Sequence, residues 1–243
     1  MANDSVRGKV AIVTGGSRGI GFSIAHALVA EGANVLITGK SDAHLSSARP
    51  RLEAAGPAKV EALKADVRNY TEVEKAVTAA ASRFGGVDIL VNNAGVGIFT
   101  NVAEMAPGQW SEIIDTNLTG VFNACHAVIP RMRERGGGYI INISSLAGKN
   151  AFVGAAAYCA SKAGLNAFSE ALMQEVRYDN IRVSYVMPGS VSTEFAGNDA
   201  ARGADWKISG DDVAAIVLDL LRSDPRSLAS RVEVRPSKPK KSS

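Results

Sequence analysis

Residues 10–21 read VAIVTGGSRGIG, a short apolar run that passes directly into a glycine-rich turn and then into a helical pattern. The apolar run predicts a buried strand over residues 10–14, and the periodicity after it predicts a helix over residues 20–31. Between a strand and a helix, glycines let the backbone approach a phosphate, and the helix N-terminus supplies N–H groups and partial positive charge. A tight structural turn would explain the glycines about as well, so this stretch needs support from the rest of the chain.

The same strand-to-helix alternation continues to the end of the chain. Further strands are predicted at 34–38, 60–64, 88–92, 139–143, 181–186 and 231–234, with helices at 43–55, 72–84, 109–134, 156–177 and 211–221. Continuously apolar strands are typical of a parallel sheet with helices on both faces. Right-handed crossovers then give one doubly wound α/β domain over residues 1–235, followed by a disordered basic tail at 236–243.

Composition excludes several classes of protein. The chain has 243 residues, 46% of them hydrophobic and 21% charged, which is ordinary for a soluble globular domain. A net charge of +3, partly in the tail, is too weak to predict a nucleic-acid partner. No apolar run approaches the roughly 20 residues that span a bilayer, so we expect no membrane association and a cytoplasmic location. The two cysteines, Cys125 and Cys159, show no ligand spacing, and we expect no metal.

The end of the second strand bears on the choice of dinucleotide. Residues 38–41 read TGKS, with no carboxylate before Asp42, whereas NAD sites usually place an acidic residue there for the ribose hydroxyls. Lys40 and, from the glycine turn, Arg18 offer cations for a 2′-phosphate instead. We therefore predict NADP(H) as the cofactor. The alternative is that Lys40 is merely exposed.

Two further strand ends carry polar or small residues. Asp66 and Val67 follow the third strand, and the sequence NNAG at 92–95 ends the fourth. Carboxyl ends of parallel strands form the ligand-binding edge of such sheets. Asp66 could accept a hydrogen bond from adenine, and Asn93 and Gly95 could line the adenosine side. Taken alone, each is also an ordinary strand-ending turn.

Tyr158 and Lys162 stand four residues apart in the predicted helix 156–177, so they share one of its faces. The unperturbed pKa of tyrosine is about 10. A nearby ammonium and the cationic nicotinamide of an oxidised cofactor would both lower that pKa, which would let Tyr158 transfer a proton near neutral pH. Ser145, after the fifth strand, could hold a carbonyl oxygen against the tyrosine. An exposed Tyr/Lys pair on a helix is common, and the pair alone is a weak signal.

Seven elements together resemble the classical short-chain dehydrogenase/reductase family, in order and spacing, over nearly the whole chain. They are TGGSRGIG at 14–21, DV at 66–67, NNAG at 92–95, Asn117, ISS at 143–145, YCASK at 158–162 and PGSVST at 188–193. The resemblance implies a Rossmann fold with a seven-stranded parallel sheet in the order 3-2-1-4-5-6-7. It also implies a homodimer or homotetramer.

The resemblance implies a catalytic tetrad of Asn117, Ser145, Tyr158 and Lys162. Lys162 would also bind the nicotinamide ribose, and Asn117 would hold a water that links Lys162 to solvent. Pro188, Val191 and Thr193 would contact the carboxamide end of the nicotinamide. The full predicted set of cofactor contacts is Gly15, Ser17, Arg18, Gly19, Ile20, Gly21, Lys40, Asp66, Val67, Asn93, Ala94, Gly95, Tyr158, Lys162, Pro188, Val191 and Thr193.

Within the family the chain is most similar to 3-oxoacyl-[acyl-carrier-protein] reductases and related carbonyl reductases. This implies NADPH-dependent reduction of a ketone or aldehyde, with a 3-oxoacyl thioester as the leading substrate. A broad-specificity carbonyl or alcohol dehydrogenase acting on a small diffusible molecule is the alternative. A third interpretation is a dinucleotide-binding sensor without catalysis. The intact tetrad argues against it, because a sensor would not need these four residues together.

Three departures from the carrier-protein reductases are visible. Residues 194–209 are short and polar, with only Phe195 and Trp206 as large apolar side chains, which predicts an open pocket. The chain lacks the glycine-rich ending after the last strand that often helps to build a tetramer. Asp179 stands where these reductases usually offer a basic residue and would repel an acidic carrier, although three arginines of the preceding long helix could attract one: Arg131, Arg133 and Arg135.

Overall fold

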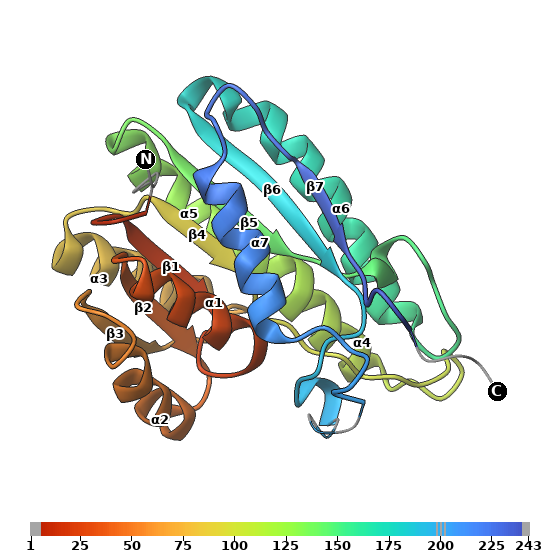
Figure 1. Cartoon of the computed structure of the whole chain (residues 1–243). Coiled ribbons are helices and arrows are strands. Elements are labelled where there is room, and N and C mark those ends of the chain that lie inside the picture. Colours follow the sequence, from red (N-terminus) through yellow and green to blue (C-terminus); the bar gives the residue numbers. More distant parts are fainter. Residues whose placement is uncertain (1–5, 198, 200, 202, 240–243) are drawn as a thin grey trace.

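A seven-stranded parallel sheet forms the centre of the computed structural model, which describes residues 6–197, 199, 201 and 203–239 (Figure 1). The strand order is β3-β2-β1-β4-β5-β6-β7, which confirms the predicted doubly wound topology. The strands are β1 (Val10–Thr14), β2 (Asn34–Gly39), β3 (Val60–Lys64), β4 (Ile89–Asn92), β5 (Gly138–Ile143), β6 (Ile181–Pro188) and β7 (Arg231–Val234). The order reverses between β1 and β4, and such a switch point opens a crevice at the carboxyl ends of the strands.

Helices cover both faces of the sheet. The first layer consists of α1 (Gly19–Ala30), α2 (Asp42–Glu53) and α7 (Gly210–Arg222), and the second of α3 (Tyr70–Phe84), α5 (Gly120–Glu134) and α6 (Ala156–Val176). Successive side chains of β1 enter opposite layers, as the pleat requires: Ala11 and Val13 pack with the first, Val10 and Ile12 with the second. Among the described residues, no helix has the length and apolar character needed to cross a membrane.

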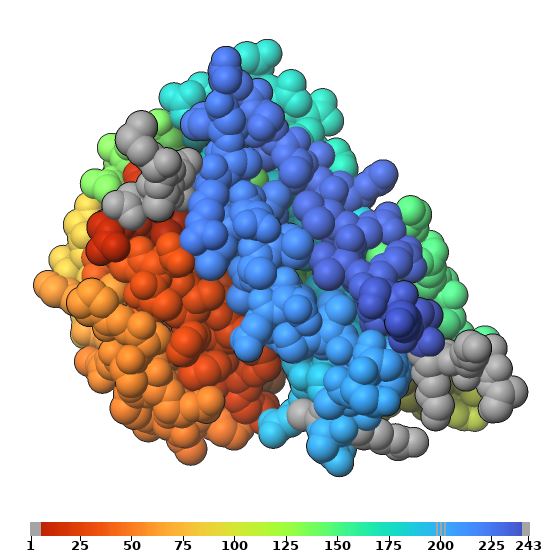
Figure 2. Space-filling model, viewed as in Figure 1, coloured from red at the N-terminus to blue at the C-terminus, as the bar shows by residue number. Residues whose placement is uncertain are grey.

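The last helix closes the first layer. Ser209 caps the start of α7 by accepting a hydrogen bond from the backbone N–H of Asp212, whose carboxylate accepts one from the N–H of Ser209. The buried face of α7 carries Val213, Val217 and Leu220, and it packs against α1. Figure 2 shows α7 and the chain leading into β7 covering the middle of this face, between the N-terminal half of the chain and α6.

The helix predicted over 109–134 is interrupted. Helix α4 (Pro107–Ile114) is followed by a π-helical turn, Asp115–Thr119, before α5 begins at Gly120. The turn holds the fully buried side chain of Asn117, which accepts from the N–H of Val96 (2.8 Å) and donates to its carbonyl (2.9 Å). Apolar periodicity of 3.6 residues does not reveal one extra residue in a turn, whereas such turns are frequent at functional sites.

Candidate active site

A cavity of about 1220 Å³ opens at the carboxyl edge of the sheet, beside the switch point between β1 and β4. Every residue predicted from the sequence to bind cofactor or catalyse lines this cavity, with two exceptions, Gly21 and Asn117. These two lie behind the wall and support residues that line it. Segments from residue 15 to residue 239 meet here. Of the predicted tail, Pro236 and Pro239 line the cavity, and residues 240–243 lie outside the described part of the chain.

The glycine turn between β1 and α1 has the backbone that a phosphate cradle needs. Gly15 (φ 64°) and Gly19 (φ 54°) adopt the left-handed conformation that other residues disfavour. Arg18 precedes α1 and makes no side-chain cap hydrogen bond, so the first N–H groups of this helix face the cavity uncapped by it. Gly21 is needed for close packing, because a Cβ there would overlap the carbonyl oxygen of Gly15 and the side-chain amide of Asn93.

We expect Gly21→Ala to weaken NADPH binding by more than about tenfold. The added methyl group meets backbone that cannot move without displacing the turn at Gly15. Titration of NADPH fluorescence measures the loss. Gly108→Ala is the matched control, since nothing lies within 4 Å of a Cβ at Gly108 in α4. Equal binding by Gly21→Ala and wild type would contradict this account of the turn.

Asn93 fastens the end of β4 to this turn. Its side-chain amide donates to the carbonyl oxygens of Thr14 (3.0 Å) and Gly15 (3.1 Å). The Thr14 hydroxyl oxygen in turn accepts from the N–H groups of Asn93 (3.0 Å) and Ala94 (3.1 Å). The sequence predicted that Asn93 lines the adenosine side. The structure adds that it holds the glycine turn in place.

One polar atom fits the presence of a bound group. Among the described residues, the Thr116 hydroxyl is the single buried side-chain polar atom without a hydrogen-bond partner within the chain, and Thr116 lines the cavity. Leaving such a group unpaired costs about 1–3 kcal/mol. Together with the glycine cradle, this hydroxyl fits a cavity that is completed by a dinucleotide. Among the described residues, no three His, Cys, Asp or Glu side chains gather as metal ligands would.

Two cationic side chains line this part of the cavity: Arg18 lies in the glycine turn, and Lys40 directly follows β2. Arg18 Nη1 lies 3.2 Å from Glu194 Oε2, and Lys40 Nζ lies 4.0 Å from Glu112 Oε1. Both cationic side chains are half-exposed, and β2 ends at Gly39 without a carboxylate before Lys40. Exposed ion pairs of this kind contribute about 0–1 kcal/mol, so a phosphate can replace the carboxylates at little cost.

Asp66, after β3, has a partner that the sequence did not reveal. The guanidinium of Arg68 binds both carboxylate oxygens, with Nη2 at 2.6 Å from Oδ2, and holds the pKa of Asp66 below its usual range. The Asp66 N–H donates to Glu72 (2.8 Å). An adenine at this position would therefore share the carboxylate with Arg68. Nothing in the sequence indicated that Arg68, among the many arginines of the chain, would pair with Asp66.

Tyr158 and Lys162 lie on α6, Ser145 is the second residue after β5, and all three line the cavity. The Lys162 ammonium is buried and donates to the carbonyl oxygen of Ile143 at 2.9 Å, 5.9 Å from the centre of the Tyr158 ring. Burial lowers the pKa of Lys162 to about 8. Burial also raises the pKa of Tyr158, which a hydrogen bond with Ser145 partly opposes.

These pKa directions differ from the expectation that Lys162 lowers the pKa of the tyrosine. The loss of solvent around Tyr158 dominates, because the cavity walls bury the phenol. The ammonium is directed to Ile143 at the end of β5. The phenol therefore stays protonated at neutral pH, which is the form that a general acid needs.

Ser161 is a supporting residue that sequence reasoning missed. Its hydroxyl donates to the carbonyl oxygen of Tyr158 (2.8 Å) and accepts from the side-chain amide of Asn117 (3.1 Å). Since Asn117 also holds both main-chain groups of Val96, these bonds tie the π-helical turn, the loop after β4 and the start of α6 together. The only sequence signal was the position of Ser161 beside Lys162.

Two phenylalanine rings contact Tyr158, and a third packs against one of them. Ring centres lie 5.6 Å apart for Phe99 and Tyr158, 5.8 Å for Phe195 and Tyr158, and 5.8 Å for Phe99 and Phe152. Phe99 and Phe152 remain about half-exposed. The sequence indicated only Phe195 and Trp206 as large apolar contacts, both of which line the cavity. The loops at 96–101 and 146–155 add the other two rings, which makes the wall around Tyr158 apolar.

A sequence profile of the short chain dehydrogenases matches residues 9–203. The chain belongs to the short-chain dehydrogenase family. It is 41% identical to a 3-oxoacyl-[acyl-carrier-protein] reductase of Chlamydia muridarum, over 79% of this chain and 77% of that protein. It is also 41% identical to an acetoacetyl-CoA reductase of Shinella zoogloeoides, over 76% and 75%.

Solved structures agree with this assignment. A metagenomic short-chain oxidoreductase in complex with NADP superposes with a TM-score of 0.84 at 38% identity, covering 96% of this chain and all of the other. The whole of that oxidoreductase therefore shares the fold of this chain. As a member of this family the protein is an oxidoreductase, and its site combines a phosphate-type cradle with a buried tyrosine and lysine.

Proposed function

We propose that the protein is an NADPH-dependent carbonyl reductase in which Tyr158 is the general acid. The observation that carries this proposal is a single cavity lined both by the glycine turn and by Tyr158, Ser145 and Lys162. NADPH, when bound, supplies the hydride for the carbonyl carbon. The protein contributes orientation and the proton.

Tyr158 and the polar residues near it each have a proposed role in the reaction. Ser145 already hydrogen-bonds with Tyr158, so a carbonyl oxygen between them receives hydrogen bonds from both. Tyr158 transfers its phenolic proton to that oxygen. Lys162, as an ammonium, binds the nicotinamide ribose and stabilises the phenolate that is left. Asn117 orders the loop at Val96 and holds a water that links Lys162 to solvent.

The remaining predicted contacts are assigned to the cofactor. The cradle of Gly15, Ser17, Gly19 and Ile20 takes the pyrophosphate, and the strand ends at Asp66, Val67, Asn93, Ala94 and Gly95 take the adenosine. Pro188, Val191 and Thr193 take the carboxamide end of the nicotinamide. The cofactor is NADP(H): the cations of Arg18 and Lys40 bind the 2′-phosphate in place of Glu194 and Glu112.

Exchange of charge at the end of β2 tests the choice of cofactor. We expect Lys40→Asp to weaken NADPH binding by about tenfold or more and to improve use of NADH, because the new carboxylate repels the 2′-phosphate and accepts from ribose hydroxyls. The readout is kcat/KM for each cofactor. Lys64→Asp, at the end of β3 and outside the cavity lining, is the matched control. A wild type that prefers NADH would overturn the assignment.

The leading substrate is a 3-oxoacyl thioester. It is supported by the names of the two relatives above, and the apolar rings around Tyr158 suit the acyl part of such a substrate. The alternative is a small, diffusible apolar ketone or aldehyde, which the half-exposed rings of Phe99 and Phe152 favour because they leave the mouth wide. The sensor reading is disfavoured, since binding a dinucleotide needs no buried Tyr158 and Lys162.

The surface charges expected to decide carrier-protein binding neutralise one another. Asp179 pairs with Arg133 at 2.7 Å, Arg131 pairs with Glu134 at 3.1 Å, and Arg135 pairs with Asp88 at 3.2 Å. The repulsion expected from Asp179 is thereby reduced, as is the attraction expected from the arginines of α5. This balance supports a diffusible thioester or ketone more than a strongly acidic protein as the substrate carrier.

A screen of NADPH consumption separates the candidates. We expect turnover of 3-oxoacyl thioesters such as acetoacetyl-CoA, and slower turnover of apolar diketones, quinones and sugars, in that order. The measurement is loss of NADPH absorbance with each substrate at equal concentration. Faster turnover of apolar diketones than of any thioester would move the assignment to the broad carbonyl reductase. Tight NADPH binding without turnover of any carbonyl would favour the third alternative, a dinucleotide-binding sensor without catalysis.

We also propose a cytoplasmic homodimer or homotetramer. Exposed apolar side chains on the second layer support self-association: Phe122 of α5 is half-exposed and stacks on His126, and Trp110 of α4 is 45% exposed. Light scattering coupled to size exclusion gives the number of subunits.

A further inference from the structure

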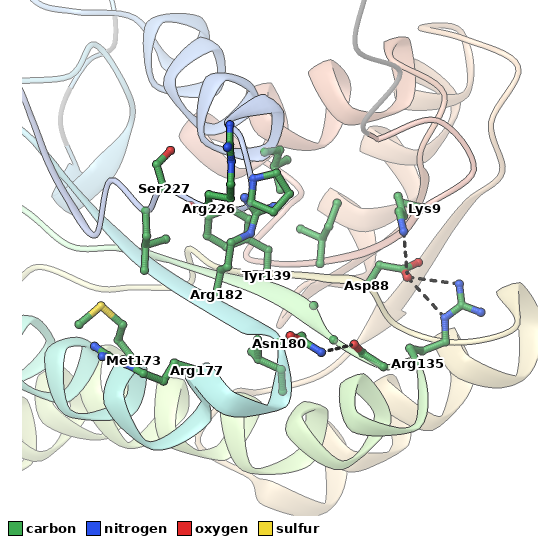
Figure 3. Close-up of a pocket in the computed structure, with 18 residues that line it drawn as sticks. Lys9, Asp88, Arg135, Tyr139, Met173, Arg177, Asn180, Arg182, Arg226 and Ser227 are labelled. Atoms are coloured by element: carbon green, nitrogen blue, oxygen red, sulfur yellow. Dashed lines mark hydrogen bonds and ion pairs between the residues drawn. The ribbon is translucent and has the colours of Figure 1, made fainter.

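A second cavity, of about 550 Å³, lies at the opposite edge of the sheet, where β1, β4, β5 and β6 begin (Figure 3). Strand β5 runs from this cavity to Ile143, beside Lys162, a distance of roughly 17 Å. The cavity shares no lining residue with the candidate active site. The proposed reduction therefore makes no use of it.

The lining of this amino-edge cavity is strongly cationic. One carboxylate, Asp88, accompanies five cationic side chains, which are Lys9, Arg135, Arg177, Arg182 and Arg226. Asp88 is already saturated, since it accepts from the N–H of Val10 (2.8 Å) and faces Arg135 (3.2 Å) and Lys9 (3.7 Å). Figure 3 shows this group on one side of the cavity and Arg182 and Arg226 on the other. On the second side Arg182 has no carboxylate partner among the described residues, whereas Arg226 is paired with Asp224.

Arg182 is fixed in place without a carboxylate. Its guanidinium lies over the Tyr139 ring, 4.2 Å from the centre, and Nη1 donates to the carbonyl oxygen of Ser223 at 3.3 Å. A guanidinium has five N–H donors, so most of those on Arg182 remain for a ligand. Stacking on a buried aromatic ring orients the group before any ligand arrives.

Two more arginines line the same cavity as Arg182. Within the described part of the chain, Arg177 has no ion pair or hydrogen bond from its side chain, and Arg226 shares its charge with Asp224 at 3.0 Å. Like charges gathered in one hollow repel each other, and an anion relieves that repulsion. Guanidinium groups bind phosphate oxygens with two parallel hydrogen bonds, which a carboxylate of the protein would otherwise use.

The rest of the lining is apolar. It consists of Ile89, Met173, Ile181, Leu221, Pro225 and Leu228. A volume of about 550 Å³ falls in the range of small-molecule sites, roughly 300–1000 Å³. The cavity thus combines a cationic side with an apolar wall, which suits an anion that carries a hydrophobic group.

We propose that the amino-edge cavity is a binding site for a small phosphate monoester with an apolar group, held by Arg177, Arg182 and Arg226. The phosphate bonds to the guanidinium groups, and the apolar group lies against Met173 and Leu228. An acidic protein surface is the less fitting ligand, because the cations line a hollow with apolar walls instead of standing out from a flat face.

Phenyl phosphate is the probe for this site. Titration calorimetry is performed on the protein saturated with NADP⁺, so that the phosphate-binding groups of the coenzyme cavity are occupied. We expect one phenyl phosphate per chain to bind more tightly than inorganic phosphate, because the ring adds apolar contact. Arg182→Gln and Arg177→Gln should each weaken binding about tenfold. Arg83→Gln is the control. It removes an exposed cation of α3 that pairs with Glu61 of β3, and it should leave binding unchanged.

The two variants protect the test against misfolding. Arg182→Gln removes the contact with Tyr139, whereas Arg177 is exposed and its replacement disturbs no contact. No binding to the NADP⁺-saturated wild type, or equal binding by wild type and Arg177→Gln, overturns the proposal. Binding of polyglutamate but not phenyl phosphate, lost in Arg177→Gln, also overturns it and identifies an acidic protein as the partner.

Discussion

Replacement of Tyr158 by phenylalanine is expected to lower kcat for carbonyl reduction by at least about 10³-fold. The phenol is the proton donor beside Ser145, and its pKa is raised by burial, so that it is protonated throughout the neutral range. Phenylalanine keeps the ring that packs between Phe99 and Phe195 and removes only the hydroxyl. The fold and the walls of the cavity should be unchanged.

Binding of NADPH separates this loss from a structural defect. We expect the Kd for NADPH, measured by fluorescence, to stay within about twofold of wild type, because the glycine turn at Gly15 and Gly19 forms the phosphate cradle and Tyr158 lies on a different element, α6. Tyr185→Phe is the matched control. It removes a hydroxyl that bonds to Glu170 at 2.9 Å, outside the cavity, and should keep full turnover. Turnover that survives Tyr158→Phe would rule out the tyrosine as the acid.

Replacement of Lys162 by methionine should abolish activity and yet stabilise the protein. Loss of the ammonium removes the charge that stabilises the phenolate and the group that binds the ribose, for which we expect kcat/KM to fall about 10³-fold. The gain in stability follows from burial: Lys162 is 5% exposed, and the pKa of its ammonium is lowered to about 8 from 10.5.

The sign of the stability effect follows from proton binding. Between pH 8 and 10.5 the unfolded chain binds more protons at Lys162 than the folded protein, so wild-type stability rises with pH across that window. Below pH 8 the folded protein bears the full cost of a buried charge. Methionine removes that cost and also the hydrogen bond to Ile143, for a net gain of about 2 kcal/mol at pH 7.

Urea unfolding of the cofactor-free protein at several pH values measures this gain. The difference between Lys162→Met and wild type should be largest at pH 7 and should shrink as the pH approaches 10.5. Lys64→Met is the control, since its ammonium is exposed and pairs with Asp42 at 3.0 Å. A Lys162→Met protein that is less stable than wild type at pH 7 would show that the buried ammonium does not lower the free energy of unfolding.

Much of the fold was predictable because its signals are local. The runs at 10–14, 60–64 and 231–234 became strands with the predicted bounds. The apolar run at 10–14 is fully buried, whereas β3 and β7 are edge strands and are only partly buried. The glycines at 15 and 19 predicted a tight turn between β1 and α1, and in the structure both adopt positive φ there. The long helix over 109–134 was predicted as one piece and contains a π-helical turn, because hydrophobic period does not count the residues of a single turn.

The strands, the glycine turn and the spacing of Tyr158 and Lys162 could be predicted from the sequence, since each depends on neighbours within a few residues along the chain. The tertiary structure alone decided the environment of those groups. Phe99 and Phe195 reach Tyr158 from two separate loops, and Lys162 is buried in the same region. Arginines from positions 135 to 226 line one cavity. Burial and charge density are set by segments far apart in the chain, and local periodicity carries no record of which segments will meet.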